Sequence, residues 1–353
     1  MKNFALFLIN VIILSSCRKK SEYPIGPNPP FENCKILPDI SPPPGFKLNN
    51  KQSVDFNGRL KEIQLIDGKV GYALGVNSAG GYAELFKTVD GGNSWVDLKL
   101  LLRENPRCMF FLNDKEGFIS CFGGKGDLLK TVDGGVNWVK QTYPNLEGNM
   151  NHIQSDKHSD LYAILSGLNT NTVLIKSKDK GNSWVIINDS SELGFSLVTF
   201  SFKIFEDRIY ISGKNGVIIV TDLNGKEIEK IVTNASNIYD FEIIDKDNIV
   251  MSASGKIIKT TDGGKKWSAT YNRSARIVDF WNPNEGIMIL NKSYCATDVY
   301  QANDIIAYTK DGGLTWDESA EATNVMSDYS DNQLLTDKGY ILLIGNNIFV
   351  LDR

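Results

Sequence analysis

A nine-residue pattern recurs along this chain and constrains its fold more than any other feature. It is clearest at 130–138 as KTVDGGVNW, and further copies read KTVDGGNSW at 87–95, KSKDKGNSW at 176–184, KTTDGGKKW at 259–267 and YTKDGGLTW at 308–316. A degraded copy, VTDLNGKEI, occupies 220–228. The Asp residues of these six copies are separated by 43, 46, 43, 40 and 49 residues. A period of that size predicts an array of similar structural units.

Each position in the pattern has a structural explanation. An alternating apolar run, such as 127–130, precedes each good copy and predicts a strand. The Asp carboxylate can accept the backbone N–H groups of a tight turn, and Gly supplies the positive φ that the turn needs. The Trp begins the returning strand, where its large ring can pack between sheets. We assign these roles to Asp90, Trp95, Asp133, Trp138, Asp179, Trp184, Asp262, Trp267, Asp311 and Trp316.

The repeated unit resembles the Asp-box, or BNR, repeat. The chain is similar to the Asp-box β-propellers, which include sialidases, sortilin-type receptors and the photosystem II assembly/stability factor family. The likeness to the last family is strongest, and residues 116–138 carry its whole run of strand, Gly-rich turn, Lys-Thr, Asp-Gly-Gly and Trp. The resemblance spans about residues 50–353 and implies an all-β propeller with four-stranded antiparallel blades.

One repeat per blade accounts for six blades, and the residues after the last repeat predict a seventh; a total of six is the alternative. The seventh blade, at 325–353, lacks the repeat and is one strand short, so we expect residues 46–58 to supply its outer strand and close the ring. The first six blades are predicted at 60–98, 107–141, 151–187, 198–231, 237–270 and 276–318.

The N-terminus has the pattern of an export signal. Lys2 precedes an apolar run at 4–14, which is too short to span a bilayer. The run ends in Leu-Ser-Ser-Cys at 14–17, which resembles the bacterial lipobox and implies lipidation of Cys17. An ordinary secretory signal with an incidental Cys is the alternative.

Three segments follow from this interpretation: a signal peptide at 1–16, a lipidated Cys with a Pro-rich tether at 17–45, and the propeller at 46–353. Eight of the eleven prolines lie in 21–45, which favours an extended spacer. The residue directly after Cys17, at the second position of the mature lipoprotein, is Arg18 and not Asp, so inner-membrane retention is not signalled by the commonest rule. We therefore expect a lipid anchor in the outer membrane of a bacterial cell envelope, and the side that the protein faces stays open.

The cysteines and the net charge bear on two questions, whether the chain contains a disulfide and whether it binds nucleic acid. Cys108 and Cys121 flank a predicted hairpin turn at 113–117, so a disulfide between them is one hypothesis and buried free thiols are the other. The formal net charge of −4 argues against a nucleic-acid partner, which needs a basic surface.

No catalytic or metal-binding pattern stands out in the sequence. The Arg-containing motif of sialidases is absent, and the sequence alone brings no two carboxylates together as glycosidases require. The two histidines, His152 and His158, are six residues apart, which fits neither a helical nor a hairpin metal pair. We therefore predict no catalytic residues, no metal and no cofactor.

Binding is the function that the sequence favours. In the families that it resembles, the Asp-boxes lie opposite the usual binding surface, which is built from the loops at the other ends of the strands. The Arg and Tyr residues predicted on that surface are Arg103, Arg107, Tyr143, Tyr271, Arg273, Arg276 and Tyr294. We predict a non-catalytic scaffold that binds a protein partner, with carbohydrate binding or glycan hydrolysis as the alternative. A further possibility is that these Arg and Tyr residues are scattered, solvated side chains that form no binding site.

Overall fold

A computed structural model describes residues 47–53, 58–77, 83–100, 102, 106–122, 127–166, 172–189, 202–212, 214–293, 302–318, 333–335, 339–344 and 347–352. All described residues belong to one compact unit within Pro38–Arg353. The predicted signal peptide, Cys17 and the tether lie outside the described residues. Among the residues that are described, no helix is long and apolar enough to cross a membrane.

Six four-stranded sheets are each formed by four consecutive strands. Sheet I contains β2 (Gly58–Leu65), β3 (Gly71–Asn77), β4 (Ala83–Thr88) and β5 (Val96–Asp97). Sheet II contains β6 (Pro106–Phe111), β7 (Gly117–Cys121), β8 (Leu128–Thr131) and β9 (Val139–Gln141). Sheet III contains β10 (Asn149–Ser155), β11 (Leu161–Ser166), β12 (Val173–Ser177) and β13 (Val185–Asn188).

The other three of these sheets follow the same order. Sheet IV contains β14 (Phe202–Phe205), β15 (Arg208–Ser212), β16 (Val217–Asp222) and β17 (Glu227–Val232), with a short 3-10 helix, η2 (Lys214–Gly216), before β16. Sheet V contains β18 (Ile238–Ile243), β19 (Ile249–Ala253), β20 (Lys256–Thr260) and β21 (Ser268–Tyr271). Sheet VI contains β22 (Ala275–Phe280), β23 (Gly286–Ser293), β24 (Ala302–Thr309) and β25 (Asp317–Glu318).

A seventh sheet joins the two ends of the described chain. Sheet VII has the order β1-β28-β27-β26, in which β1 is Lys47–Ser53, β26 is Gln333–Leu335, β27 is Gly339–Ile344 and β28 is Asn347–Asp352. Strand β1 runs antiparallel to β28, with Lys47 opposite Asp352 and Ser53 opposite Asn347. The prediction that a segment within 46–58 supplies the outer strand of the last sheet is therefore confirmed.

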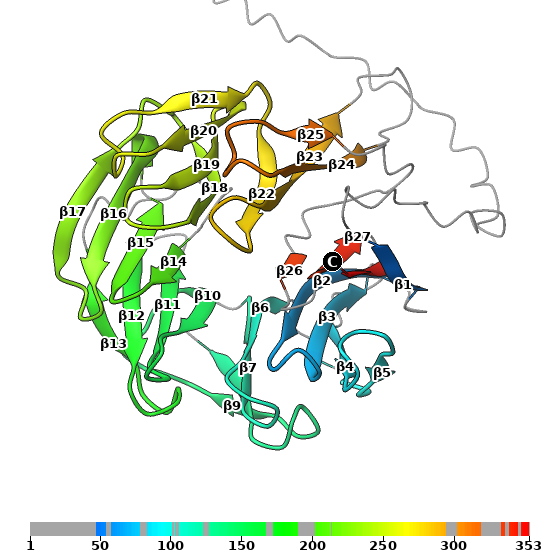
Figure 1. The fold of residues 1–353 in the computed structure, drawn as a ribbon. Helices are drawn as coiled ribbons and strands as arrows, with labels where there is room; N and C mark the ends of the chain where they lie inside the picture. The colour runs from blue at the N-terminus through cyan, green and yellow to red at the C-terminus, as the bar shows by residue number, and fades with distance from the viewer. Residues whose placement is uncertain are drawn as a thin grey trace, which may run out of the picture. The chain divides into compact units, whose positions relative to one another are not determined.

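Neighbouring sheets contact one another through their first strands (Figure 1). Strand β6 contacts β2 and β10, β14 contacts β10 and β18, and β18 contacts β22, while β2 also contacts β26 and β27. This arrangement of four-stranded antiparallel sheets confirms the predicted β-propeller. The predicted blade boundaries agree closely with the strands; for example, the predicted blade at 107–141 is sheet II, which spans 106–141.

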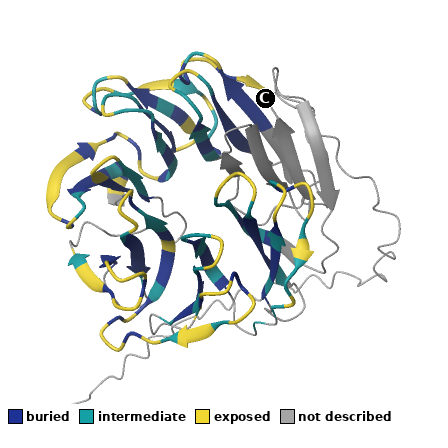
Figure 2. Cartoon of the chain, turned by 60° about the horizontal axis from the view of Figure 1, so that its bottom comes forward, coloured by how far each residue is buried: buried dark blue, intermediate teal, exposed yellow. Residues whose placement is uncertain are grey.

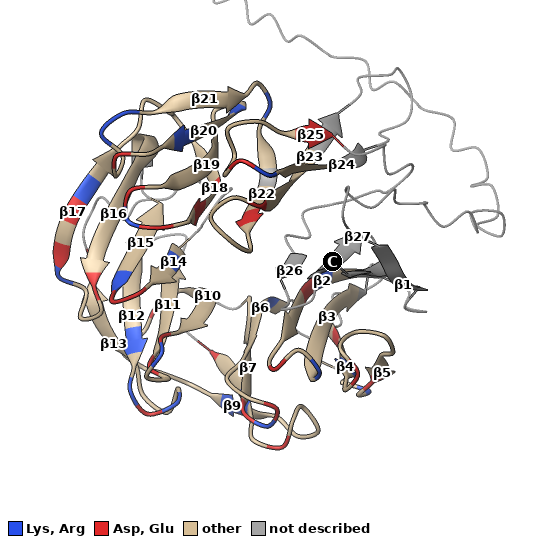
Figure 3. Cartoon of the chain, viewed as in Figure 1, with Lys and Arg blue, Asp and Glu red and all other residues tan. Residues whose placement is uncertain are grey.

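The core lies between neighbouring sheets. Between sheets I and II, Tyr72, Leu74, Met109 and Phe111 are all at most 2% exposed, and the rings of Tyr72 and Phe111 stack with centroids 3.5 Å apart. Figure 2 shows buried residues along the middle strands and exposed residues on turns and outer strands. Strand β17 is such an outer strand, and its alternating charges are exposed (Figure 3). Stacked sheets of this kind bury large side chains on both faces.

The repeated pattern forms a hydrogen-bonded turn between the third and fourth strands of sheets I, II, III, V and VI; we call these five segments the Asp turns. In sheet I, Asp90 accepts hydrogen bonds from the Thr88 hydroxyl and the Ser94 backbone N–H, both at 2.8 Å. Gly92 has a φ of 90°, and the indole N–H of Trp95 donates to its carbonyl at 3.0 Å. The Asp carboxylate and the Gly with positive φ thus both contribute to the turn, and the Trp adds a hydrogen bond from its indole N–H.

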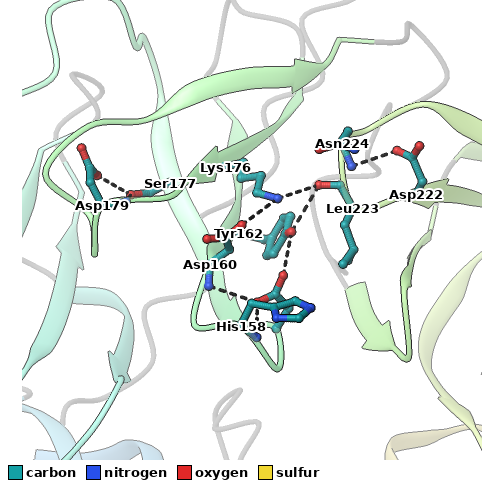
Figure 4. Close-up of polar contacts among 10 residues, drawn as sticks. His158, Asp160, Tyr162, Lys176, Ser177, Asp179, Asp222, Leu223 and Asn224 are labelled. Carbon is teal, nitrogen blue, oxygen red and sulfur yellow. Dashed lines mark hydrogen bonds and ion pairs between the residues drawn. The ribbon is translucent and has the colours of Figure 1, made fainter.

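In sheets II, III and V, a lysine links the sheet to the following one beside the turn. It lies on the third strand, next to the Thr or Ser that opens the Asp turn, and it donates to a backbone carbonyl in the turn of the following sheet. Lys130 donates to the Lys180 carbonyl at 2.8 Å, and Lys259 donates to the Gly312 carbonyl at 2.6 Å. In sheet III the donor is Lys176, which reaches the degraded turn of sheet IV (Figure 4).

The proposed disulfide between Cys108 and Cys121 is not formed, and both cysteines are buried free thiols. Cys108 lies opposite Ser120 in the register of β6 and β7, whereas Cys121 lies opposite Pro106. The two side chains point to opposite faces of sheet II, so that Cys108 packs with residues of sheet III and Cys121 with residues of sheet I. A disulfide requires Cβ atoms that face each other, which this register prevents.

Candidate functional site on the inner strands

The first strand of a sheet lies at the inner edge of the array, and several of these strands carry a β-bulge. The register shifts between Leu60 and Glu62 in β2, between Pro106 and Cys108 in β6, and between Asn151 and Gln154 in β10. A bulge leaves an extra residue unpaired and changes the direction of its side chain. The extra residues include Lys61, Arg107 and His152, so corresponding bulges present basic side chains on three consecutive inner strands.

Arg107 is held by two uncharged groups. Its Nε donates to the side-chain oxygen of Asn151 at 3.0 Å, which ties β6 to β10. Its guanidinium carbon lies 5.7 Å from the ring centroid of Phe122, a residue that directly follows β7 and is 56% exposed. A guanidinium over an aromatic face is a favourable cation–π arrangement. The pair forms a partly apolar, positively charged surface where the second strand of sheet II leads toward the third.

His152 lies beside this pair in a strained conformation. Its φ is 50°, which is uncommon for a residue that is not glycine, and its side chain is exposed. The surrounding protein limits solvation of the ring, and this, together with the positive charges of Arg107, Lys203 and Lys61, lowers its pKa to about 4. The imidazole is therefore neutral at pH 7 and can donate or accept a hydrogen bond.

Polar side chains also tie the inner strands to one another. The side chain of Gln64 accepts from the Phe111 N–H at 2.7 Å and donates to the Phe111 carbonyl at 2.8 Å. Gln154 donates to the Phe202 carbonyl at 3.0 Å. These contacts satisfy backbone groups that the inner edge of a sheet would otherwise expose, and they hold the bulged strands in place.

Carboxylates gather on the inner strands of sheets V and VI. Lys203 on β14 pairs with Glu242 on β18 at 2.7 Å, and Asp240 on β18 accepts from the Val278 N–H at 3.0 Å. Asp279 on β22 is close to both acids, and Figure 3 shows acidic positions on β18 and β22. Burial, followed by the negative charge of Glu242, raises the pKa of Asp279 to about 7, although Lys203 opposes the shift.

Charged side chains are distributed unevenly along the inner edge. Lys61 and Arg107 lie on β2 and β6 and the neutral His152 on β10, and β2 also carries Glu62, whose carboxylate accepts from the Met109 N–H. Three carboxylates lie on β18 and β22, and Lys203 on β14 pairs with one of them, Glu242. Within the described part of the chain, no three His, Cys, Asp or Glu side chains are grouped so as to hold a metal ion. The Arg107 guanidinium can bind an anion, and Asp279 can exchange a proton near neutral pH.

The predicted binding residues do not converge on this site, with the exception of Arg107. Tyr143 is 8% exposed and its hydroxyl donates to the Gly181 carbonyl in the Asp turn of sheet III, so its placement on the binding surface was wrong. Arg273 pairs with Glu318 at 3.2 Å, and the hydroxyl of Tyr271 donates to the same carboxylate, which joins the outer strands of sheets V and VI. Arg103, Tyr294 and the side chain of Arg276 lie outside the described residues.

Sequence reasoning missed Lys61, His152, Phe122 and Lys203 as site residues. A signal was present for the first of these, since Lys61 and Arg107 each lie four positions before the last residue of their strands, Leu65 and Phe111. Aligning the inner strands by their ends would have placed both at the same level. His152 would not have been found in this way, because it lies three positions before the last residue of β10, Ser155.

Comparison with known proteins identifies structural relatives only. No family model and no curated protein matches the chain. The solved structure of YCF48 bound to D1 peptide aligns with a TM-score of 0.62 and 17% identity, covering 89% of this chain and 98% of that one. YCF48 from Cyanidioschyzon merolae gives a TM-score of 0.63 at 13% identity, with coverages of 87% and 98%.

Propellers with other activities align comparably. The GH74 xyloglucanase from Xanthomonas campestris gives a TM-score of 0.57 at 13% identity, covering 84% of this chain and 52% of that one. A polysaccharide lyase described as an ulvan lyase gives 0.54 at 10% identity, with coverages of 85% and 96%. At these identities the shared property is the fold. This chain has the fold of a β-propeller. Function has to be argued from the site, because propellers carry unrelated activities.

Proposed function

We propose that this protein is a non-catalytic propeller scaffold that binds a protein partner at the surface formed by Arg107 and Phe122. The observation that carries the proposal is the exposed Phe122 ring beneath the Arg107 guanidinium, at 5.7 Å. Arg and aromatic residues dominate the energetics of protein interfaces, and here one of each lies in direct contact. The alignment with YCF48 bound to D1 peptide supports the proposal, because a propeller of this architecture accommodates a peptide.

We further propose that the repeats are Asp-boxes of the kind found in the photosystem II assembly/stability factor family, and that the chain is a lipoprotein of a bacterial cell envelope. Cys17 would carry the lipid and anchor the propeller to the outer membrane through the Pro-rich tether. Metabolic labelling with a fatty acid tests the anchor: wild type should incorporate label, and Cys17→Ser should not. Label on the Cys17→Ser variant would exclude lipidation at this site.

A photocrosslinking experiment tests the binding surface. A photoreactive amino acid at Phe122 should capture protein in intact cells, whereas the same group at Val136 should not. Val136 is 68% exposed but lies in the Asp turn of sheet II, at the other end of the strands. Equal capture at both positions, or none at Phe122, would contradict protein binding at the proposed surface.

Glycan hydrolysis is the second candidate, and the carboxylates on β18 and β22 are the observation that favours it. A raised carboxyl pKa near other acids is a property of glycosidase general acids, and Asp279 has such a pKa at about 7. The ion pair between Glu242 and Lys203 argues against glycan hydrolysis, because the second carboxylate that a glycosidase needs is already bound to a lysine. Hydrolysis of a polysaccharide panel that disappears in Asp279→Asn would establish it, and carbohydrate binding without hydrolysis would appear in the same panel.

A further inference from the structure

The basic bulge residues and Phe122 form one group of side chains whose chemistry defines a ligand. We call Lys61, Arg107, His152 and Phe122 the inner-strand cluster. We propose that the inner-strand cluster binds an acidic protein segment, with an Asp or Glu carboxylate at Arg107 and an adjoining apolar side chain against Phe122. This inference rests on the proposed function and specifies the chemistry of the partner.

The guanidinium of Arg107 is held in place by uncharged groups, so that its charge is not neutralised. In the part of the chain that the structure describes, its partners are the amide oxygen of Asn151 and the face of Phe122, and neither carries a charge. A guanidinium has five N–H donors, and the bond to Asn151 uses only the Nε donor. The two terminal amino groups can therefore form the paired hydrogen bonds that a carboxylate accepts from arginine.

The charges that act on His152 are positive. The charged groups that act on its ring are Arg107 on β6, Lys203 on β14 and Lys61 on β2, and all are cationic. They come from strands on both sides of β10, so their charges meet at the imidazole. Lys203 is balanced by Glu242, whereas Arg107 has no acidic partner among the described residues. An anion bound at Arg107 would balance the charge of this guanidinium.

The backbone at His152 supports a binding role. A positive φ of 50° costs conformational energy, and such strain persists at sites where the surrounding structure fixes a side chain for a purpose. The bulge changes the direction of the His152 side chain, and the imidazole, which is neutral and able to donate one N–H, lies close enough to Arg107 to feel its charge. A carboxylate has two oxygens and can accept from both.

Phe122 distinguishes a peptide from a simple anion. Its ring is 56% exposed and presents only apolar surface beside the charge of Arg107. An acidic residue next to an apolar one satisfies both groups at once, and the exposed ring gains free energy when an apolar side chain covers it. Inorganic anions would use the cations alone. A glycan that contains uronic acids is the competing ligand, and it enters the test as an arm of its own.

Binding of two peptide pools to the purified propeller tests the inference. Both pools are fluorescent, N-acetylated and C-amidated octapeptides with one Phe or Leu; one pool has Asp or Glu beside it, and the other has Asn or Gln. We expect the acidic pool to bind about tenfold more tightly than the neutral pool, and the difference to shrink at high salt. Arg107→Gln should remove the preference, whereas the control Lys265→Gln, at an exposed position in an Asp turn, should keep it.

The imidazole of His152 gives a second readout that needs no affinity measurement. Its pKa, followed by NMR with His158→Gln to assign the signal, should rise from about 4 when the acidic pool is bound. It should also rise in the free Arg107→Gln variant, because a neighbouring positive charge is removed. A folded variant with an unchanged His152 pKa would show that Arg107 does not act on this site.

Failure of the inference can be told from failure of the proposed function. Crosslinking of protein at Phe122 with equal binding of the two pools would leave protein binding intact and overturn carboxylate recognition. Tighter binding of oligogalacturonate than of either pool would overturn it in favour of a glycan. Retention of the acidic preference in Arg107→Gln would overturn the assignment to this cluster.

Discussion

The ammonium group of Lys176 lies 3.1 Å from the carbonyl oxygen of Leu223, which belongs to the next sheet. Lys176 is only 5% exposed, and it also pairs with Asp160 at 2.9 Å and lies over the ring of Tyr162 (Figure 4). The hydroxyl of Tyr162 donates to the same Leu223 carbonyl at 3.2 Å. Lys176, a residue of the repeated pattern, therefore connects sheet III to sheet IV.

Replacement of Lys176 by Met should destabilise the propeller. The variant keeps the length of the side chain but leaves the Asp160 carboxylate and the Leu223 carbonyl with fewer partners. Because Asp160 is 23% exposed and can be solvated, we expect a loss of about 2 kcal/mol rather than the larger cost of a fully buried charge. The midpoint of urea unfolding at neutral pH measures it.

Lys178→Met is the matched control, since Lys178 is two residues away and exposed. Its effect should stay within about 0.5 kcal/mol. If the two variants unfold at the same urea concentration, the link between sheets III and IV contributes nothing to stability.

Replacement of Asp311 by Ala should weaken the Asp turn of sheet VI in a pH-dependent way. The carboxylate accepts from the Leu314 N–H at 3.0 Å and from the Thr315 N–H at 2.9 Å, and the loss of these bonds should cost about 1–2 kcal/mol at pH 7. Although burial raises it, hydrogen bonds from Thr315 and Thr309 leave the pKa of Asp311 lower than usual.

The sign of the pH effect follows from this lowered pKa. The stabilisation by ionised Asp311 is complete above the unfolded-state pKa, near 4, and is lost as the pH falls through the lower folded-state pKa. The difference between wild type and Asp311→Ala should therefore shrink in acid. A control at the exposed Asp114 side chain should show little difference at any pH, and a constant gap for Asp311→Ala would mean that its charge plays no part.

The residues of the turns and the order of the strands along the chain could be predicted from the sequence. The Asp and Trp roles could be predicted because each hydrogen bond of the turn, such as that from Trp95 to Gly92, spans only a few residues. Strand β1 could be assigned to the last sheet because every other sheet was predicted to have four strands, whereas the C-terminal residues supplied only three.

Contacts between sheets could not be predicted in the same way. The hydroxyl of Tyr143 reaches Gly181, 38 residues later, and nothing near Tyr143 in the sequence indicates this. The meeting of Lys203, Glu242 and Asp279 depends on which side chain each inner strand presents, and bulges change that order. The hairpin that carries Cys108 and Cys121 was predicted, but the pairing of its two strands was not. A shift of one residue in that pairing decides on which face of the sheet each cysteine side chain lies.

Cys108 and Cys121 should behave as protected thiols. Burial raises the pKa of the Cys108 thiol to about 11, so almost no reactive thiolate exists at neutral pH. In a variant that keeps only these two cysteines, a thiol reagent should label neither in the native protein and both after unfolding. A single intact mass with and without reductant is expected; a loss of two hydrogens from the unreduced protein would indicate the bridge after all.

Replacement of Asp279 by Asn should make stability less dependent on pH. Lys203 on β14 and Asp240 and Glu242 on β18 face Asp279, and its pKa is raised to about 7 by burial and by the two acids. Because the folded state holds this proton more tightly than the unfolded state, wild type should lose stability as the pH rises from about 4 to about 7 and no more above it. Asn carries no charge, so the variant should be the more stable protein at pH 8, by an amount on the order of 2 kcal/mol. Urea unfolding of both proteins across this pH range provides the comparison. Parallel curves would show that Asp279 is ionised in the folded protein and that the Lys203 charge is sufficient to balance its neighbours.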